Sequence, residues 1–238
     1  IASGGEDNII KIWRATDGRE VITLTGHTNE LRPIAFSPDG QYLATAGFDA
    51  QVKIWRTSDW QEVTTITGHP TVIISLAFSP DGRYLASGGW FGDNQVKIWR
   101  VSDWQEVTTL IGHGGPVHAL DFSPDAQYLA TGSYDATIKI WRVSDWQEII
   151  TLRGHTDGLR TLDFSPDGQH LASAGFDAII NLWRVSDWGR IYSFTAHTDW
   201  SVCYFTPDGQ YLLSSSRDAT IKLWRASDGE LLLTYDQE

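Results

Sequence analysis

Five sets of side chains in this sequence combine the residue types of nucleophilic catalysis: a histidine, a serine or threonine, and an aspartate. Each set ends with a tryptophan. The sets are His27, Thr45, Asp49 and Trp55; His69, Ser87, Asp93 and Trp99; His113, Thr131, Asp135 and Trp141; His155, Ser173, Asp177 and Trp183; and His197, Ser214, Asp218 and Trp224. Five near-identical copies favour a structural role, because an active site rarely appears once in every repeat of a chain.

No other residues have the spacing of a catalytic or cofactor site. His118, His170 and Cys203 are isolated in the sequence. A single cysteine cannot form an intrachain disulfide or a multi-cysteine zinc cage. No glycine-rich phosphate loop precedes a helical segment. We therefore expect no cofactor, no metal and no catalytic residue.

The bulk composition argues against two classes of partner. The 238-residue chain has a formal net charge of −12, whereas duplex binding needs clustered Lys and Arg. No apolar run is long enough to span a membrane and no secretory signal is present. The chain begins at Ile1 and has no Met. We expect a cytoplasmic segment internal to a longer product, without nucleic-acid or membrane partners.

The elements that must position the five sets are strands of a repeat. The tryptophans recur every 41–44 residues, as do Gly-His and Ser-Pro-Asp motifs. Within one copy, the apolar runs 117–122, 128–132, 137–141 and 148–152 are short, β-branched or aromatic, and separated by turn residues. This pattern predicts one antiparallel four-stranded sheet per repeat and an all-β fold.

The Gly-His motif, the Asp six residues before a strand-ending Trp, and the period together resemble the WD-repeat β-propeller family. The regular copies look prokaryotic, although Trp-Arg replaces the usual Trp-Asp. The resemblance implies four-stranded blades around a channel. It also implies that each Asp holds its His, which meets the strand Ser or Thr, which in turn meets the indole N–H. We call each such set a tetrad.

The resemblance implies a single propeller domain over residues 1–238, with at least six blade units. The units are about 1–25 (partial), 26–67, 68–111, 112–153, 154–195 and 196–238. The first lacks its first strand, so the ring needs preceding residues, another chain or domain, or closure with a defective blade. We favour preceding residues in a larger protein.

The Trp-Arg dipeptide suggests a cross-strand ion pair. If a three-residue turn joins the third and fourth strands, Arg100 faces Glu106, and the same register pairs Arg14 with Glu20, Arg56 with Glu62 and Arg142 with Glu148. An opposite-charge pair of this kind contributes about 0.2–1 kcal/mol.

Two series of aromatic residues are candidate binding surfaces. The first is expected at the Gly-His end of the blades, with acidic neighbours: Phe48, Trp90, Phe91, Tyr134, Phe176, Trp200, Asp157 and Asp199. Trp90 and Phe91 lie in a loop two residues longer than its counterparts. The second series occupies the Ser-Asp-Trp turns at the opposite end: Trp60, Trp104, Trp146 and Trp188. Either series could instead fill space between blades.

We therefore expect a non-enzymatic scaffold or sensing module that binds a protein or peptide, with acidic side chains favouring a basic one. Two alternatives remain open. The first is a lectin-like propeller that uses the turn tryptophans, and the second is a regulatory sensor domain of a larger multidomain prokaryotic enzyme.

Overall fold

The computed structural model describes residues 1–236, and every regular element in that range is a β-strand. The predicted all-β class is therefore confirmed. The described part of the chain contains no helix with the length and apolar character needed to cross a bilayer. Two units are distinguished, Ile1–Gly112 (unit 1) and His113–Glu238 (unit 2).

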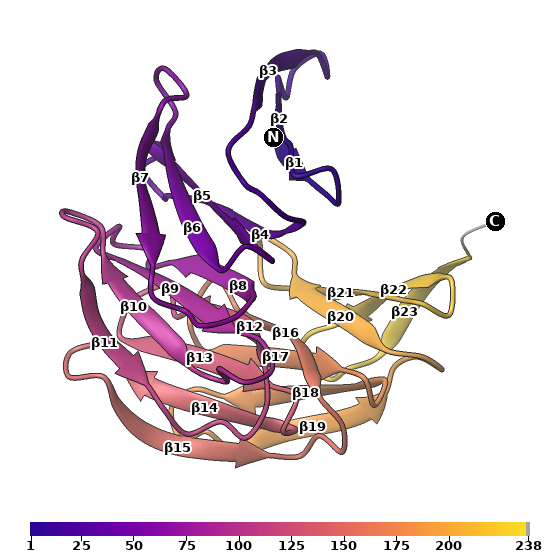
Figure 1. The fold of residues 1–238 in the computed structure, drawn as a ribbon. Coiled ribbons are helices and arrows are strands. Elements are labelled where there is room, and N and C mark those ends of the chain that lie inside the picture. The colour runs from indigo at the N-terminus through magenta and orange to yellow at the C-terminus, as the bar shows by residue number, and fades with distance from the viewer. Residues whose placement is uncertain (237–238) are drawn as a thin grey trace. The chain divides into compact units, whose positions relative to one another are not determined.

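Unit 1 contains a three-stranded sheet followed by two four-stranded sheets, in which consecutive strands pair antiparallel (Figure 1). The strands are β1 (Ala2–Gly4), β2 (Ile10–Trp13), β3 (Glu20–Leu24), β4 (Leu31–Phe36), β5 (Tyr42–Gly47), β6 (Gln51–Arg56), β7 (Glu62–Thr67), β8 (Ile73–Phe78), β9 (Tyr84–Gly89), β10 (Val96–Arg100) and β11 (Glu106–Leu110).

Unit 2 contains three four-stranded antiparallel sheets (Figure 1). Their strands are β12 (Val117–Phe122), β13 (Tyr128–Ser133), β14 (Thr137–Arg142), β15 (Gln147–Arg153), β16 (Leu159–Phe164), β17 (His170–Gly175), β18 (Ile179–Arg184), β19 (Arg190–Thr195), β20 (Ser201–Phe205), β21 (Tyr211–Ser216), β22 (Thr220–Arg225) and β23 (Leu231–Asp236). Five complete sheets and a partial first one match the predicted blades.

The Ser-Pro-Asp-Gly segments form the turn between the first and second strands of a sheet. In β4–β5, Asp39 Oδ1 accepts hydrogen bonds from the Ser37 hydroxyl at 2.6 Å and the Gln41 amide at 2.9 Å. Gly40 has φ of 69°, in the left-handed region that suits glycine. Ala126 occupies the same place in the β12–β13 turn with φ of 56°, so that turn is strained.

Neighbouring sheets of unit 2 bury a common core. Ala130, Ile138 and Ile140 of one sheet pack with Leu171 and Trp183 of the next. Ala172, Ile180 and Leu182 pack in the same way with Leu212 and Trp224. No single sheet can bury both faces, so stacking supplies the apolar burial that stabilises the fold.

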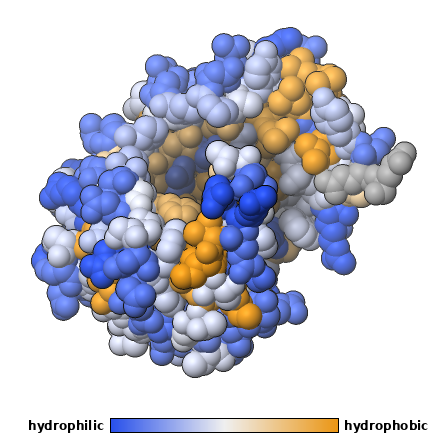
Figure 2. All heavy atoms as spheres, turned by 90° about the horizontal axis from the view of Figure 1, so that it is seen from above, coloured by the Kyte–Doolittle hydropathy of each residue, from blue (hydrophilic) through white to orange (hydrophobic). Residues whose placement is uncertain are grey.

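The last sheet of unit 2 has no such cover among the described residues of its unit. Its Leu213, Leu233 and Tyr235 are 44%, 47% and 57% exposed, whereas Ala172, which corresponds to Leu213, is fully buried. Polar residues cover most of the surface in view in Figure 2, with hydrophobic residues in a few places. An apolar sheet face of this kind marks a surface that a further sheet can cover.

The predicted Arg–Glu cross-strand pairs are wrong. The turn contains four residues, 101–104, rather than the three residues 102–104, because the Arg100 amide donates to the Gln105 carbonyl at 2.9 Å. Glu106 pairs with Trp99 beside a bulge. Because a one-residue shift turns a side chain to the other face of a sheet, Arg100 instead meets Asp103 within the turn, at 2.8 Å.

The same Arg-to-Asp pairing recurs in every sheet. It includes the hairpins of Arg184 and Arg225, for which the sequence predicted no Arg–Glu pair. The pairs are Arg14–Asp17, Arg56–Asp59, Arg142–Asp145, Arg184–Asp187 and Arg225–Asp228. Arg225 also meets Glu230 at 2.6 Å. The Glu residues of the fourth strands pair with lysines instead, as Glu106 does with Lys97 at 3.0 Å. Exposed pairs of these types contribute little stability, about 0–1 kcal/mol each.

Candidate functional site

The structure brings the four residues of each tetrad together. In β12–β14, Trp141 donates its indole N–H to the Thr131 hydroxyl at 3.0 Å, and Thr131 is bonded to His113 Nε2 at 2.8 Å. His113 Nδ1 lies 3.1 Å from Asp135. A neutral imidazole with its proton on Nδ1 satisfies every link, since it accepts from the hydroxyl and donates to the carboxylate.

The tetrad of β4–β6 in unit 1 has the same connections. Trp55 donates its indole N–H to the Thr45 hydroxyl at 2.9 Å, and Thr45 is bonded to His27 Nε2 at 2.8 Å. His27 Nδ1 lies 2.7 Å from Asp49 Oδ2, which also accepts the Thr28 amide at 3.1 Å. Trp55 is 4% exposed, so its indole N–H has no access to water and depends on Thr45 for a partner.

The three remaining complete tetrads repeat this geometry. Their hydroxyl–His Nε2 distances are 2.7–2.8 Å and their indole–hydroxyl distances are 2.8–2.9 Å. His69 and Asp93 form the tightest His–Asp pair, and His197 Nδ1 lies 3.0 Å from Asp218. The first sheet retains only the indole link, from Trp13 to Ser3 at 2.8 Å.

The electrostatics of three tetrad side chains, His27, His197 and Asp135, agree with neutral histidine and ionised aspartate. Burial lowers the pKa of His27 and of His197, although Asp49 and Asp218 oppose the shift. Burial alone would raise the pKa of Asp135, but hydrogen bonds from His113, Thr137 and Gly114 lower it well below its usual range. These groups therefore hold their charge state through the physiological pH range.

The tetrad hydroxyl is poorly placed to act as a nucleophile. Thr45, Ser87, Thr131 and Ser173 are fully buried and Ser214 is 1% exposed. Each oxygen also accepts an indole N–H, which a catalytic serine would have to release. A nucleophile must reach its substrate, so the geometry favours an internal hydrogen-bonded brace in each sheet.

A row of rings lies at the His–Asp end of the sheets in unit 2. Tyr134 contacts His118, with ring centroids 4.8 Å apart, and Phe176, at 4.9 Å. Phe176 lies 6.4 Å from Trp200, and the Arg160 guanidinium lies over both, at 5.3 Å and 4.1 Å from the centroids. We call these five residues the aromatic row. The aromatic row includes three of the predicted binding residues, Tyr134, Phe176 and Trp200.

The sequence analysis missed two members of the row, His118 and Arg160, as binding residues. Both occupy β-bulges, where the pairing of β12 with β13 and of β16 with β17 shifts by one residue. A bulge re-aims a side chain, and here it directs the residue onto the aromatic side chain that precedes the tetrad Asp. No motif in the sequence marks the bulge.

Two smaller aromatic groups occur in unit 1. Arg32 lies over the Phe48 ring at 5.2 Å and forms an ion pair with Glu30 at 2.7 Å. Trp90 and Phe91 pack edge to face in the longer loop, with centroids 5.3 Å apart, and Phe91 is 57% exposed.

Two acidic side chains lie beside members of the aromatic row, and Asp199 Oδ1 accepts the Trp200 amide at 2.7 Å. Asp157 and Asp199 are both exposed. The Asp157 charge reaches Tyr134, whose pKa is raised chiefly by burial. The row therefore lies in a surface that carries negative charge at its edge and the positive charge of Arg160 within it.

Three of the four turn tryptophans at the opposite end, Trp60, Trp104 and Trp188, pack on other side chains. Trp104 meets Tyr42 edge to face at 5.3 Å, and Trp188 meets Tyr128 at 5.4 Å. Trp60 packs on the core shared by the first two sheets. All four turn tryptophans have φ of 57–58°, so each stands in the left-handed position that glycine fills in the outer sheets: Trp60, Trp104, Trp146 and Trp188, against Gly18 and Gly229.

No group of three or more His, Cys, Asp and Glu side chains suited to a metal ion occurs among residues 1–236. Cys203 is buried, and burial raises the pKa of its thiol to about 12. It is therefore a packed thiol rather than a reactive one.

Comparisons with known proteins agree with this geometry. The family model described as "WD domain, G-beta repeat" matches residues 18–56, 60–100, 104–142, 146–184 and 188–225. Each matched segment covers the last strand of one sheet and the first three strands of the sheet that follows it in the chain, so the sequence repeat is offset from the sheets.

Individual relatives match over a single repeat. Nuclear distribution protein PAC1 of Mycosarcoma maydis is 46% identical over 43 residues, which are 18% of this chain and 10% of the relative. Nuclear distribution protein nudF of Aspergillus terreus is 49% identical over 43 residues, or 18% and 9%. A Lissencephaly-1 homolog of Caenorhabditis briggsae is 42% identical over 43 residues, or 18% and 11%. The matches thus span about a tenth of each relative's length. With five matched repeats over most of its length, this chain belongs to the WD domain, G-beta repeat family.

Proposed function

We propose that this chain is a non-enzymatic interaction module that binds a protein or peptide partner through the aromatic row. The observation that carries the proposal is the continuous stack of His118, Tyr134, Phe176, Arg160 and Trp200 at one end of unit 2. Aromatic and Arg side chains dominate binding energy at protein interfaces. The tetrads beneath the row hold the loops that carry it.

The chemistry of the row defines a partner segment. The rings and the half-buried stem of Arg160 form an amphipathic platform for an apolar or aromatic anchor. Asp157 and Asp199 beside it favour a Lys or Arg next to that anchor. Arg160 adds a positive charge within the row, so a segment that carries both an anchor and a basic residue fits better than a uniformly basic one.

A peptide-display selection tests this proposal directly. Wild type is expected to enrich segments with an aromatic or aliphatic anchor next to Lys or Arg, and a Phe176→Ala/Trp200→Ala variant to lose at least tenfold in affinity for them. Tyr204→Ala is the matched control, because Tyr204 is an exposed aromatic of unit 2 outside the row. Equal affinity of all three folded proteins would contradict the row as the binding surface.

The longer loop of unit 1 is a second surface for the same function. Removal of Trp90 and Phe91 together deletes a solvent-facing edge-to-face pair. A Trp90→Ala/Phe91→Ala variant that retains full affinity for the selected segments would limit the binding surface to the row.

The lectin-like alternative is less well supported. The rings of Trp104 and Trp188 already pack on Tyr42 and Tyr128, whereas a sugar needs an open aromatic face. A glycan array on wild type and a Trp104→Ala/Trp146→Ala variant distinguishes the two functions. Selective glycan binding that is lost in the variant would favour the lectin.

We also propose that residues 1–238 belong to a single propeller domain of a larger cytoplasmic protein. The support is the exposed apolar face of the last sheet and the three-stranded first sheet. A further blade, from the same polypeptide or from a partner, would cover such a face. A sensor role beside an enzyme domain is compatible with this arrangement. The single-domain proposal would be supported if a longer polypeptide that contains residues 1–238 migrated as a smaller particle, and resisted proteases better, than residues 1–238 alone.

A further inference from the structure

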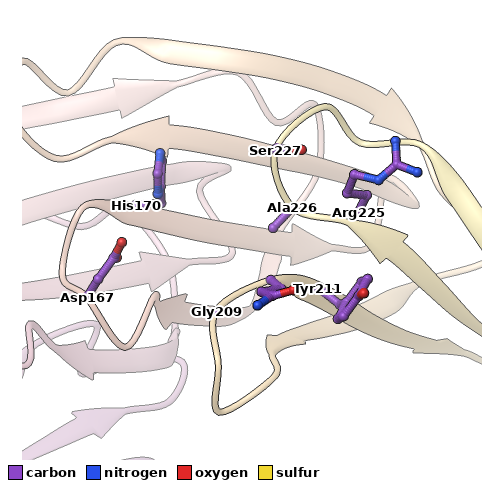
Figure 3. Close-up of a pocket in the computed structure, with 8 residues that line it drawn as sticks. Asp167, His170, Gly209, Tyr211, Arg225, Ala226 and Ser227 are labelled. Carbon is purple, nitrogen blue, oxygen red and sulfur yellow. The ribbon is translucent and has the colours of Figure 1, made fainter.

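Two cavities occur at equivalent places in two sheets and are therefore features of the repeat. One, of about 340 Å³, is lined by residues 209–211 and 225–227 and by His170 (Figure 3). The other, of about 440 Å³, is lined by residues 82–84 and 100–102 of unit 1. The loop between β9 and β10 has no such counterpart. It separates the tetrad hydroxyl from the tryptophan by twelve residues, whereas the other sheets have ten.

The aspartates of the four other complete tetrads each accept two backbone amides in addition to the histidine. Asp135 Oδ1 accepts the Thr137 amide at 2.9 Å, and its Oδ2 accepts the Gly114 amide at 2.8 Å. These donors hold both carboxylate oxygens and stabilise the negative charge. The two equivalent bonds, at 2.9–3.2 Å, are made by Asp49, Asp177 and Asp218.

Asp93, the tetrad aspartate of the longer loop, lacks both of these donors among the described residues. The residue after its tetrad histidine is Pro70, which has no N–H. Asp93 Oδ1 makes no hydrogen bond within residues 1–236. The side chain is 7% exposed and keeps only the contact of Oδ2 with His69. A buried carboxylate oxygen without a donor is unfavourable unless another group compensates its charge.

Two further oxygen atoms in this part of the sheet lack a partner. Thr71 Oγ1 and Asn94 Oδ1 are buried and make no hydrogen bond in the part of the chain that the structure describes. The two loops that carry them are in contact, since the Trp90 amide donates to the Val72 carbonyl at 2.9 Å. Thr71 Cγ2 also lies 3.7 Å from the position that a Cβ on Gly92 would take. One pair of contacting loops thus contains a carboxylate, an amide and a hydroxyl oxygen with no hydrogen bond between them.

Oxygen atoms of these three types are ligands of hard cations. Ca²⁺ takes about six to eight oxygens from carboxylates, amides, backbone carbonyls and water, in a flexible geometry that irregular loops can supply. We propose that Asp93 Oδ1, Asn94 Oδ1 and Thr71 Oγ1 bind a calcium-class cation between the two loops. The net charge of −12 on the chain attracts such an ion. Only one of the three ligands is an acid, so the set differs from the His, Cys, Asp and Glu clusters that residues 1–236 lack.

The cation joins the loop before β8 to the loop that carries Trp90 and Phe91. It therefore fixes the surface formed by those two rings, which pack edge to face with centroids 5.3 Å apart. The inference does not depend on the proposed function, because the ion binds whether or not a partner does. A site with a single carboxylate is expected to be weak, with a dissociation constant of about 10⁻⁴–10⁻³ M.

Calcium titration of the metal-free protein tests the proposal. Physiological ionic strength screens diffuse binding to the acidic surface. Calorimetry with CaCl₂ should show one saturable ion per chain, and Ca²⁺ should displace Tb³⁺ whose luminescence is excited through tryptophan. The backbone amides of Trp90, Asp93 and Asn94 should shift on saturation. Absence of saturable binding, or shifts confined to other loops, would overturn the proposal and assign the three oxygens to ordered water.

Two variants each remove one ligand and leave the tetrad intact. Thr71→Val keeps the shape of the side chain, and Asn94→Gly suits the φ of 54° at that position. Each should weaken Ca²⁺ binding by about tenfold or more. Ala50→Gly is the matched control, because Ala50 follows Asp49 with φ of 59° and that aspartate has both amide donors. Equal affinity of wild type and both ligand variants would refute the assigned ligands.

Replacing Asn94 with aspartate distinguishes a bound cation from a hydrogen bond within the loop. A second carboxylate should increase Ca²⁺ affinity by about tenfold, because the number of charged ligands tunes calcium sites. If the Asn94 amide instead donated to Asp93, the variant would place two carboxylates together. It would then unfold at a lower temperature without any gain in Ca²⁺ affinity, and that result would overturn the proposal.

Discussion

Replacing Thr131 with valine tests whether the tetrads act as internal braces. The change keeps the shape of the side chain and removes one hydroxyl. That hydroxyl is fully buried, accepts the Trp141 indole N–H at 3.0 Å and bonds His113 Nε2 at 2.8 Å. Valine leaves a buried donor and a buried acceptor without partners.

The expected loss follows from these two orphaned groups. A buried polar group left unsatisfied costs about 1–3 kcal/mol, so two of them cost about 3 kcal/mol if one finds partial compensation. For a domain of this size, each kcal/mol lowers Tm by about 2–4 °C. We expect Thr131→Val to lower Tm by roughly 6–12 °C, and Thr131→Ser to lower it by much less, because serine keeps the hydroxyl.

Calorimetry and urea unfolding followed by tryptophan fluorescence measure this loss. The control is Thr156→Val, because Thr156 is exposed and only its backbone amide contacts the tetrad Asp177, at 2.9 Å. The control should change the free energy of unfolding by less than about 0.5 kcal/mol. If Thr131→Val cost no more than Thr156→Val, the hydrogen-bonded chain would not be a stabilising brace.

Three further predictions concern backbone strain and pH. Ala126→Gly should increase the free energy of unfolding by about 1 kcal/mol, because Ala126 has φ of 56°. Gly40→Ala should decrease it by a similar amount, because Gly40 has φ of 69° and no atom lies near the added Cβ. Denaturant unfolding measures both changes, and a destabilised Ala126→Gly or a stabilised Gly40→Ala variant would refute the strain. Asp121 accepts the Phe164 amide at 2.6 Å, and burial, with the nearby charge of Asp163, raises its pKa to about 8. Since the folded pKa lies above the unfolded value near 4, stability is full below about pH 4 and is lost as pH rises towards 8, at up to about 1.4 kcal/mol per pH unit. Burial also raises the pKa of Asp163, to about 6, so Asp121→Asn should remove the slope between about pH 6 and 8 and retain one below pH 6. Parallel pH curves of the variant and wild type above pH 6 would contradict this assignment. The lowered pKa values of the tetrad residues act in the opposite direction, because His27 and Asp135 favour folding above their unfolded pKa values. Unfolding monitored by circular dichroism should therefore show stability falling below about pH 6.5 and again below about pH 4, and a flat profile in acid would count against the charge states assigned to the tetrads.

Much of the fold could be predicted because its determinants are local and repeated. Turn residues such as Asp39 and Gly40 form their hydrogen bonds within a few positions of the chain. The tetrad members were identifiable because their spacing recurs in five copies, and the geometry then showed which atoms bond. The length of the Arg100–Gln105 turn was misjudged, since a tryptophan in the left-handed conformation is not visible in a sequence.

The sequence by itself determined the strands, their grouping into sheets, and which polar residues recur together, because short-range turn chemistry and period-two patterns specify these features. Only the tertiary structure decided what the recurring residues contact. Stacking of the rings in the aromatic row depends on bulges at His118 and Arg160 and on packing between sheets. Contacts between sheets, such as the hydrogen bond from the Phe164 amide to Asp121, join residues 43 positions apart, and packing rather than short-range sequence specifies them.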